Sequence, residues 1–243
     1  MKNVALCFIA TGKYESFLDR IHTSALKYFL PKHNRSFFVF SDSPVKKEDV
    51  TTIKIEHLPW PLPTLLRYKY MLEGKVAEGQ DYVFYCDVDM LFVDYLEEEL
   101  FGDITAVRHP CFSSGYDSER DWSPYGKNEK SSSFIEPALR KNYFYGGFQG
   151  GSAKKYSEAM LFMHKNILKD LRKNLIARYH DESHWNKYLV DNPPDNILSS
   201  SYCYPDDDEL EKYQEFYSFD TPLKKKILAL SKNHDLFREY EIN

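Results

Sequence analysis

Hydrophobic and polar positions follow two different periods in the first ninety residues of the chain. Short, nearly continuous apolar runs are typical of buried strands, and the alternation of Ile53 and Ile55 with polar residues is typical of a more exposed strand. Between these runs apolar residues recur every three or four positions, as on the buried face of a helix. Pro31 closes the first such stretch, and Thr64 is placed to cap the second. The pattern predicts the order strand, helix, strand, strand, helix, strand, at residues 4–10, 14–30, 36–40, 51–58, 64–77 and 82–86.

This alternation predicts an α/β fold with a Rossmann-like, doubly wound sheet and flanking helices. Ligands of such sheets bind beyond the carboxyl ends of the strands, so residues 9–14 and the segment after residue 86 are expected to share one crevice. No G-x-G-x-x-G pattern follows the first strand, which argues against a dinucleotide-binding domain.

The remainder of the chain continues the mixture of helices and strands. The expected elements are a strand, a long polar loop, a long amphipathic helix, a short helix, a strand, a solvated acidic loop and a short apolar run, at residues 104–108, 113–129, 153–176, 180–190, 196–204, 206–209 and 227–230. Neither an internal repeat nor a linker interrupts the sequence, so a single domain over residues 1–243 is favoured.

Asp87 and Asp89 stand between two apolar runs, directly after the strand predicted at residues 82–86. Two carboxylates in such a place need compensation, because an unpaired buried charge is very costly. In an extended segment residues i and i+2 point to the same side, so both carboxylates can converge on one divalent cation that carries a diphosphate. A D-x-D triplet is also common by chance, and the alternative is a strand-end turn with solvated aspartates.

Composition narrows the class of protein. Hydrophobic residues make up 42% of the 243 residues and aromatic residues 16%, enough for a sizeable core and compatible with stacking on sugars or bases. The formal net charge of −5 argues against a nucleic-acid-binding protein. The four cysteines have no C-x-x-C spacing, so free thiols in a reducing compartment are expected. With no membrane anchor or signal peptide in the sequence, a soluble, cytoplasmic protein is expected.

Two further segments could carry chemistry. Four glycines, at positions 146, 147, 150 and 151, interrupt an aromatic run, and they indicate either a wall against a sugar or a tightly packed hairpin turn. In H-D-E-S-H at residues 180–184, Asp181 is a candidate N-cap, which places Glu182 in the first helical turn, where the dipole favours its ionised form.

An ionised glutamate in a cleft suits a nucleophile or a stabiliser of an oxocarbenium ion, and the alternative is ordinary helix capping. The order H-D-E-S-H differs from H-E-x-x-H, so zinc is not expected. Two interpretations of His109 are open: a core histidine whose hydrogen bonds are satisfied within the protein, and a hydrogen-bond donor to a sugar hydroxyl.

Taken together, the chain resembles glycosyltransferase family 6, which includes the histo-blood group A and B transferases and the α-1,3-galactosyltransferases. The most specific block is HDESHWNKYL at residues 180–189. The other blocks occur in the family's order: IATGKY, FFVFSDSP, DYVFYCDVDM, HPCF, YFYGGFQGGS and SKNH, at residues 9–14, 37–44, 81–90, 109–112, 143–152 and 231–234. The resemblance implies a GT-A fold and the transfer of galactose or N-acetylgalactosamine (GalNAc) from the UDP-sugar to the 3-hydroxyl of a galactoside, with retention at the anomeric carbon.

The resemblance also assigns donor-binding positions. Asp87 and Asp89 match the aspartates that hold Mn²⁺ (or Mg²⁺) against the diphosphate of UDP, so metal dependence is implied. Lys232 and Arg238 match basic residues of a tail that closes over the diphosphate. The other positions assigned to the donor are Ala10, Thr11, Tyr14, Arg67, Val88, Tyr145, Gly146, Gly147, His180 and Asp181.

Catalytic and acceptor positions follow from the same resemblance. Glu182 matches the glutamate proposed as a covalent nucleophile or as the stabiliser of an ion pair during same-face attack, and both remain open. His109 and Tyr179 match acceptor-binding positions, with Tyr179 in place of a usual tryptophan. Gly147 matches the site where glycine leaves room for an acetamido group, which implies GalNAc, although Tyr145 is bulky enough to fill that space.

Two alternatives to the GalNAc transferase are a UDP-galactose-specific α-1,3-galactosyltransferase and a non-catalytic carbohydrate-binding protein on the same scaffold. Within the domain, residues 1–90 are expected to form the nucleotide-binding half, 91–230 the sugar and acceptor half, and 231–243 a mobile tail. The expected partners are a UDP-sugar and a galactoside or oligosaccharide acceptor; the acceptor glycan and the oligomeric state stay open. Because mammalian members carry an anchor and a stem before this point, a soluble microbial or viral enzyme is expected.

Overall fold

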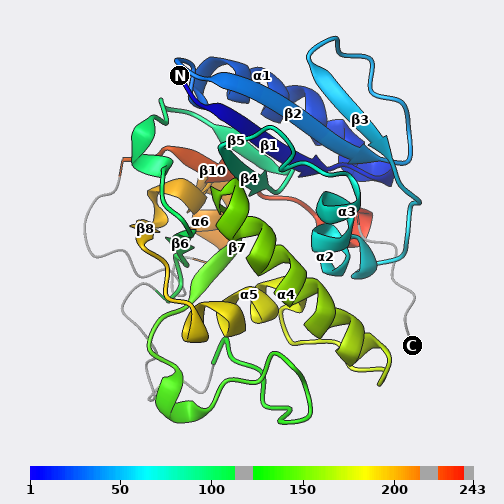
Figure 1. Ribbon diagram of the computed structural model, residues 1–243, viewed down its shortest axis with the longest axis vertical. Coiled ribbons are helices and arrows are strands. Elements are labelled where there is room, and N and C mark those ends of the chain that lie inside the picture. The colour runs from blue at the N-terminus through cyan, green and yellow to red at the C-terminus, as the bar shows by residue number, and fades with distance from the viewer. Residues whose placement is uncertain (113–122, 214–223, 238–243) are drawn as a thin grey trace.

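The computed structural model describes residues 1–112, 123–213 and 224–237. Its centre is a seven-stranded sheet in the order β3-β2-β1-β4-β7-β6-β8 (Figure 1). In chain order these strands are β1 (Asn3–Ile9), β2 (Asn34–Ser41), β3 (Val50–Lys54), β4 (Tyr82–Cys86), β6 (Thr105–Arg108), β7 (Phe144–Ser152) and β8 (Asn196–Leu198). The first four run parallel, β7 runs antiparallel to β4 and β6, and β8 runs parallel to β6. This mixed sheet confirms the predicted fold class, a single GT-A-like α/β domain.

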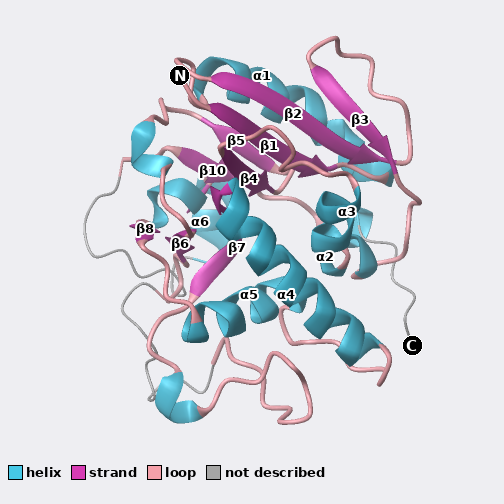
Figure 2. Cartoon of the chain, in the orientation of Figure 1, coloured by secondary structure: helices cyan, strands magenta, loops and turns pink. Residues whose placement is uncertain are grey.

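Helices cover both faces of the sheet (Figure 2). Along β1, Leu6 and Phe8 join one core cluster together with residues of α1 (Leu18–Tyr28). Ala5 and Cys7 join the other, with residues of α3 (Arg67–Glu73), α4 (Ala153–Leu171) and α5 (His180–Asp191). All four side chains are completely buried. A strand covered on both faces requires the continuous apolar run that predicted it.

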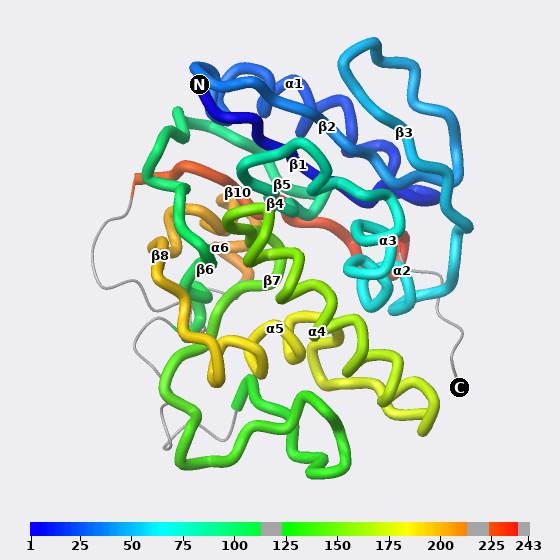
Figure 3. The backbone as a smooth tube through the Cα atoms, in the orientation of Figure 1, coloured from blue at the N-terminus to red at the C-terminus, as the bar shows by residue number. Residues whose placement is uncertain are grey.

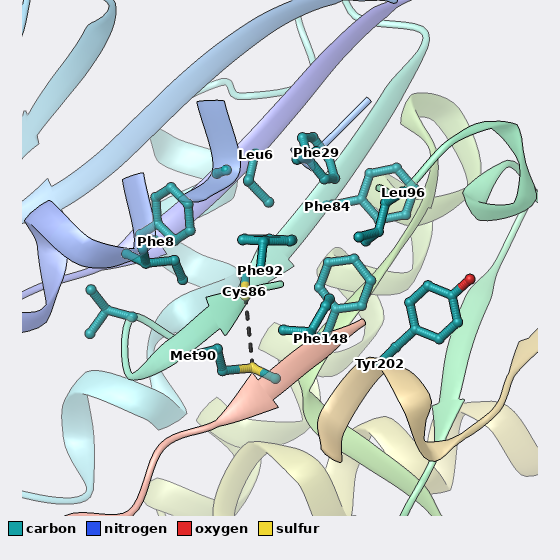
Figure 4. Packing of buried hydrophobic residues seen from close by; sticks show 14 of the residues in the cluster. Leu6, Phe8, Phe29, Phe84, Cys86, Met90, Phe92, Leu96, Phe148 and Tyr202 are labelled. Atoms are coloured by element: carbon teal, nitrogen blue, oxygen red, sulfur yellow. Dashed lines mark hydrogen bonds between the residues drawn. The ribbon is translucent and has the colours of Figure 1, made fainter. Parts of the chain in front are cut away.

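A small second sheet ties the C-terminal part of the chain to the D-x-D segment. Its order is β5-β10-β9, formed by β5 (Met90–Phe92), β10 (Ile227–Ala229) and β9 (Tyr204–Pro205). Figure 4 shows Met90 and Phe92 inside the first core cluster, beside Phe148 of β7. After β10 the chain crosses toward α2 (Leu62–Leu65) and α3 and reaches α7 (His234–Phe237) (Figure 3). The backbone N–H of Leu230 donates to the carbonyl oxygen of Asp89 over 3.0 Å, so the tail starts beside the D-x-D.

Five element predictions were wrong in detail. The helix expected at residues 64–77 divides into α2 and α3, which ends at Glu73, and the strand expected at residues 51–58 ends at Lys54. The first helix splits, because Gly12–Phe17 forms a 3₁₀ turn before α1 begins at Leu18. The strand expected at residues 196–204 ends at Leu198 and gives way to a 3₁₀ turn, Ser200–Cys203. The acidic loop expected at residues 206–209 opens a helix, α6 (Asp207–Tyr213), because Asp206 Oδ1 accepts the N–H of Glu209 and the acidic first turn suits the helix dipole.

Other expectations were confirmed to within a few residues: the strand β6, the long helix α4, which ends at Leu171, and the short helix α5. Residues 113–122 of the expected long loop lie outside the described residues. All four cysteines are free thiols, as predicted. Among the described segments, no helix combines the length and apolarity that a membrane crossing requires.

Candidate functional site

A pocket lies beyond the carboxyl ends of β1 and β4, where a doubly wound sheet is expected to bind its ligand. Thr11 and Tyr14 line it after β1, and Asp87, Val88 and Asp89 line it after β4. The predicted crevice between these two strands is therefore present. The other lining residues come from β1, the segment between β3 and α3, the start of α3, β4 and the C-terminal tail: Ile9, His57, Leu58, Trp60, Pro63, Thr64, Arg67, Tyr85, Lys232 and Phe237.

Arg67, the first residue of α3, is the hub of the polar contacts at this pocket. Its guanidinium is buried and lies 4.0 Å from the centroid of the Tyr85 ring. Nη2 donates to Asp87 Oδ1 over 3.2 Å, and Nη1 donates to the carbonyl oxygen of Gly146 over 2.8 Å. Nη1 also lies 3.1 Å from Asp181 Oδ2. Two carboxylates compensate the buried cation, and residues of β4, β7 and α5 meet at one side chain.

The caps predicted at Thr64 and Asp181 were wrong for a common reason. Thr64 lies inside α2, and Asp181 lies inside α5, which begins at His180. The Thr64 hydroxyl donates to the Asp181 carboxylate, and Arg67 pairs with that same carboxylate. Burial raises the pKa of Asp181 to about 6, against the opposing effects of Arg67 and Thr64. The two polar side chains thus bind each other rather than the backbone at their own helix ends.

The two aspartates of the D-x-D have different partners. Asp87 Oδ1 accepts a second hydrogen bond, from the Tyr85 hydroxyl over 2.8 Å. Asp89 forms an ion pair with the ammonium group of Lys232, which lies 5.7 Å from the centroid of the Tyr14 ring. Val88 and Asp89 form a turn, so the segment is not extended as expected, yet both carboxylates line the same pocket. Lys232 thereby places the C-terminal tail at the D-x-D.

The short helix α7 packs against one wall of the pocket. The ring centroid of Phe237 lies 5.5 Å from that of Tyr14 and 5.1 Å from that of Phe17. Phe237 and Lys232 therefore bring both ends of residues 232–237 to the pocket. Arg238 and the last five residues of the predicted mobile tail lie outside the described residues.

Glu182 lies in the first turn of α5, as predicted, and is fastened to β7. Its Oε2 accepts the backbone N–H of Gly146 over 2.7 Å, and its Oε1 accepts the hydroxyl of Tyr143 over 2.8 Å. This approach requires glycine, because a Cβ on residue 146 would lie 2.9 Å from the Cβ of Glu182. The carbonyl of Gly146 is bound by Arg67, so one residue links Glu182 to the arginine that holds Asp87.

The ionised state expected for Glu182 is disfavoured by the surroundings of its side chain. Burial raises the pKa of Glu182 to about 8, although the bonds from Gly146 and Tyr143 lower it. Repulsion from Asp181 and Asp87 adds to the rise. The loss of hydration thus outweighs the favourable position at the helix N-terminus, and the carboxyl group is mostly protonated at pH 7.

The glycine-rich segment is a continuous strand, so the alternative of a hairpin turn is wrong. Gly147 lies against Tyr145 and Asp87: a Cβ on residue 147 would lie 2.5 Å from Tyr145 Cε1 and 2.6 Å from Asp87 Oδ2. The Tyr145 ring thus covers the space that the missing side chain leaves. Residues 145–147 do not line the pocket that Arg67 and the aspartates share, but Gly147 borders it through Asp87.

His109 and Tyr179 join a separate aromatic cluster, built around Phe112, Tyr125 and Tyr143. The Nδ1 atom of His109 accepts the N–H of Cys111 over 3.1 Å, and burial lowers the pKa of His109 to about 3, so the ring is neutral at pH 7.

The two remaining candidates have different surroundings. The ring of His180 lies 5.2 Å from that of Trp60, which lines the pocket. Ala10 is completely buried in the first core cluster, so its side chain supports the pocket rather than lining it.

Asn186 is a structural residue of the site that sequence reasoning missed. It is buried on α5, where its Oδ1 accepts the N–H of Phe144 and its Nδ2 donates to the carbonyl oxygen of Phe144, both over 2.8 Å. The side chain thus pairs with both backbone polar groups of Phe144, as a neighbouring strand would. It thereby holds α5 against the start of β7, where Glu182 binds Gly146. Its position four residues after Glu182, on the same face of the helix, was the available signal.

Replacement of Asn186 by alanine is expected to lower the free energy of unfolding by about 2–4 kcal/mol, because the N–H and carbonyl groups of Phe144 lose their buried partner. Chemical denaturation monitored by circular dichroism measures the change. The control is Asn192→Ala at the exposed end of α5, which removes only a bond to the carbonyl oxygen of Tyr188. Equal small losses in both variants would contradict the assigned role.

Comparison with known proteins shows which family the sequence resembles. The sequence model described as glycosyltransferase family 6 matches residues 65–239. The chain is 30% identical over 220 residues to the O-antigen biosynthesis glycosyltransferase WbnI of Escherichia coli, covering 87% of this chain and 90% of that protein. It is 28% identical to the histo-blood group ABO system transferase 1 of Rattus norvegicus, covering 97% and 68%.

A third relative is the human globoside alpha-1,3-N-acetylgalactosaminyltransferase 1, which is 27% identical, over 84% of this chain and 61% of that protein. The matched region contains Arg67, both aspartates of the D-x-D, the glycine-rich strand and the start of α5. The extent of these matches and the mixed α/β domain lead to one conclusion: this chain belongs to glycosyltransferase family 6.

Proposed function

We propose that this chain is a retaining, metal-dependent hexosyltransferase that moves GalNAc from UDP-GalNAc to the 3-hydroxyl of a galactoside, forming an α-1,3 bond. The observation that carries the proposal is the convergence on Arg67. Arg67 contacts Asp87 of the D-x-D and the carbonyl of Gly146, while the N–H of Gly146 binds Glu182. A transferase of this type needs a diphosphate site and a carboxylate for the reacting carbon side by side.

A divalent cation fits the donor atoms at the D-x-D. Carboxylate oxygens are the ligands that Mn²⁺ and Mg²⁺ prefer, and Asp87 and Asp89 both face the pocket. Within the residues that the structure describes, no group of three or more His, Cys, Asp or Glu side chains could hold the ion alone. The other ligands would therefore be diphosphate oxygens and water. When bound, the cation would offset the charge that develops on the leaving UDP.

Lys232 would supply a second positive charge for the diphosphate. Its ammonium is part-buried beside Asp89 and Tyr14, so an entering diphosphate gains a charge-assisted bond in surroundings partly shielded from water. Phe237 packs on Tyr14 at the same side of the pocket as Lys232, and it would limit the access of water to the donor.

Glu182 would act as a carboxylate in the reaction. Either it forms a bond to the anomeric carbon as the bond to UDP breaks, or it stabilises an ion pair while the acceptor hydroxyl attacks from the same face. The donors at both of its oxygens, Tyr143 and Gly146, favour the charged form in either case. Tyr179 and the neutral ring of His109, in the adjoining aromatic cluster, would bind the acceptor.

The choice of donor sugar depends on Gly147 and Tyr145. GalNAc is supported by glycine at position 147 and by the similarity to a globoside alpha-1,3-N-acetylgalactosaminyltransferase. A second candidate function, transfer of galactose, is favoured by one observation: the Tyr145 ring lies where a side chain on residue 147 would be, and so reduces the room for an acetamido group.

We expect faster release of UDP from UDP-GalNAc than from UDP-galactose, with Mn²⁺ and a galactoside acceptor, and an α-1,3 linkage in the product. Parallel kinetics with both donors and linkage analysis measure this. A preference for UDP-galactose that Tyr145→Leu shifts toward UDP-GalNAc would instead support the second candidate. The control for a loss of packing is Tyr202→Leu, which changes a buried tyrosine of the first core cluster, against which Tyr145 also packs. Sugar binding without any UDP release would indicate a non-catalytic carbohydrate-binding protein.

A further inference from the structure

We propose that Tyr143 is a positioning residue that fixes the orientation of the Glu182 carboxyl group and favours its charged form; the inference rests on the proposed function of Glu182. The Tyr143 hydroxyl donates to Oε1 over 2.8 Å, and the Gly146 N–H donates to Oε2 over 2.7 Å. The carboxyl group is thus held at both oxygens by one chain segment, in which Tyr143 precedes the first residue of β7 and Gly146 lies inside the strand.

The Tyr143 ring has little freedom to move its hydroxyl away. The side chain is 3% exposed, and its ring centroid lies 5.7 Å from that of His109 and 5.3 Å from those of Phe112 and Tyr125. Its carbonyl oxygen accepts the N–H of His109 over 3.1 Å. Close packing on several sides makes another rotamer costly, so the hydroxyl stays at Glu182. Tyr143 therefore connects Glu182 with the aromatic cluster that contains His109.

A hydroxyl group can serve both protonation states of Glu182, whereas a backbone N–H can only donate. Tyr143 donates to the carboxylate, and by rotation about its C–O bond it can accept from the protonated carboxyl group. Hydrogen bonds to a charged partner are about twice as strong as bonds between neutral groups. The net effect of the Tyr143 hydroxyl is therefore to stabilise the carboxylate, and its loss makes the protonated form more favourable.

The other groups near Glu182 give this bond its importance. Asp181 on the same helix and Asp87 at the end of β4 oppose the ionisation of Glu182 by repulsion. Burial and the nearby carboxylates raise the pKa of two thiols and two phenols around Glu182, so these groups stay neutral. They are Cys111 after β6, Cys203 before β9, and Tyr143 and Tyr145 at β7. The bonds from Tyr143 and Gly146 are thus the contacts that counteract burial and repulsion.

The test is the pH dependence of Tyr143→Phe. We expect the acid limb of the kcat/KM profile, and the pH at which the infrared band of the protonated Glu182 carboxyl group disappears, to move upward by about one pH unit. The band is assigned by its loss in Glu182→Gln and needs no turnover. At pH values below the acid limb, kcat/KM of Tyr143→Phe is expected to be about tenfold lower than that of the native protein. At high pH the two values should approach each other. The control, Tyr125→Phe, removes a hydroxyl from the same cluster that donates to the Asn142 carbonyl oxygen over 2.8 Å, and it should leave both pH values in place.

A second variant keeps the ring and the packing. With 3-fluorotyrosine at position 143 the hydroxyl is a stronger donor, and we expect the carboxyl band to titrate at lower pH. Unchanged titration in both variants, or an equal loss of activity at every pH, would overturn the inference. If the native protein transfers no sugar, the proposed function fails, but a shifted carboxyl band would still support the contact and an unshifted band would still overturn it.

Discussion

Glu182→Gln is expected to lower the turnover number for sugar transfer by at least about 10²–10³-fold, while the fold and the binding of UDP are kept. Glutamine has nearly the same shape, and its amide can accept the Gly146 N–H and donate to the Tyr143 oxygen, so the contacts of α5 with β7 persist. What is lost is the negative charge that stabilises, or bonds to, the anomeric carbon. Steady-state UDP release with a galactoside acceptor measures the effect.

The matched control is Glu158→Gln, which removes a carboxylate from the exposed side of α4, where it pairs with Lys155 over 2.9 Å. This variant should retain the native turnover number. A Glu182→Gln enzyme with more than about one tenth of the native rate would contradict the assigned role, because charge stabilisation of a developing cation is worth more than one factor of ten. UDP binding by calorimetry separates a loss of chemistry from a loss of the donor site.

The same substitution is expected to change how stability depends on pH. Burial raises the pKa of Glu182 from 4.5 to about 8, so between these values the native state holds a proton that the unfolded state has released. The contribution of Glu182 to the free energy of unfolding therefore falls as pH rises through this window. Denaturation at pH 4 and pH 8 should show Glu182→Gln gaining stability relative to the native protein at the higher pH. An equal difference at both values would contradict the raised pKa.

Local sequence patterns predicted those features of the site that depend on residues close together in the sequence. The apolar run before Asp87 indicated a buried strand, and the position of the D-x-D after that run placed both aspartates at the ligand-binding edge of the sheet. Glu182 was found because its segment has the pattern of a helix start. In both cases the element forms because it buries apolar residues that are close together in the sequence. The spacing of these residues reveals the strand or the helix.

Long-range partners could not be predicted in this way. Thr64 and Asp181 each fit the local rule for a helix cap, but they are 117 positions apart in the sequence. The Thr64 hydroxyl donates to the Asp181 carboxylate, which also pairs with Arg67. The expectation that Glu182 is ionised failed for a similar reason. The burial that raises its pKa depends on β7, and no local pattern places β7 against α5. The roles of Tyr143 and Asn186 also come from this packing of β7 on α5. The physical limit is that local propensity is weak compared with tertiary contacts.

Asp89→Asn is expected to remove most of the Mn²⁺-stimulated activity, by about 10³-fold, and to weaken Mn²⁺ binding in the presence of UDP. Asparagine keeps the size of the side chain but supplies a neutral oxygen, and it leaves the Lys232 ammonium without its carboxylate. Asp89 gives the cleaner test of the two aspartates, because Asp87 also accepts bonds from Arg67 and Tyr85 and its change would disturb the hub.

Two measurements separate the loss of the metal from other losses: UDP release during a Mn²⁺ titration, and Mn²⁺ binding followed by electron paramagnetic resonance, which requires no turnover. Asp94→Asn is the control, since Asp94 follows β5 and pairs with Lys224 over 2.6 Å without lining the pocket. If Asp89→Asn bound Mn²⁺ and released UDP like the native protein, the cation would have to be held elsewhere, and the pairing of Asp89 with Lys232 would be only structural. If chelation of all divalent ions left the native enzyme fully active, the positive charge that the diphosphate needs would come from the chain's own cations, of which Lys232 is the one already placed at Asp89.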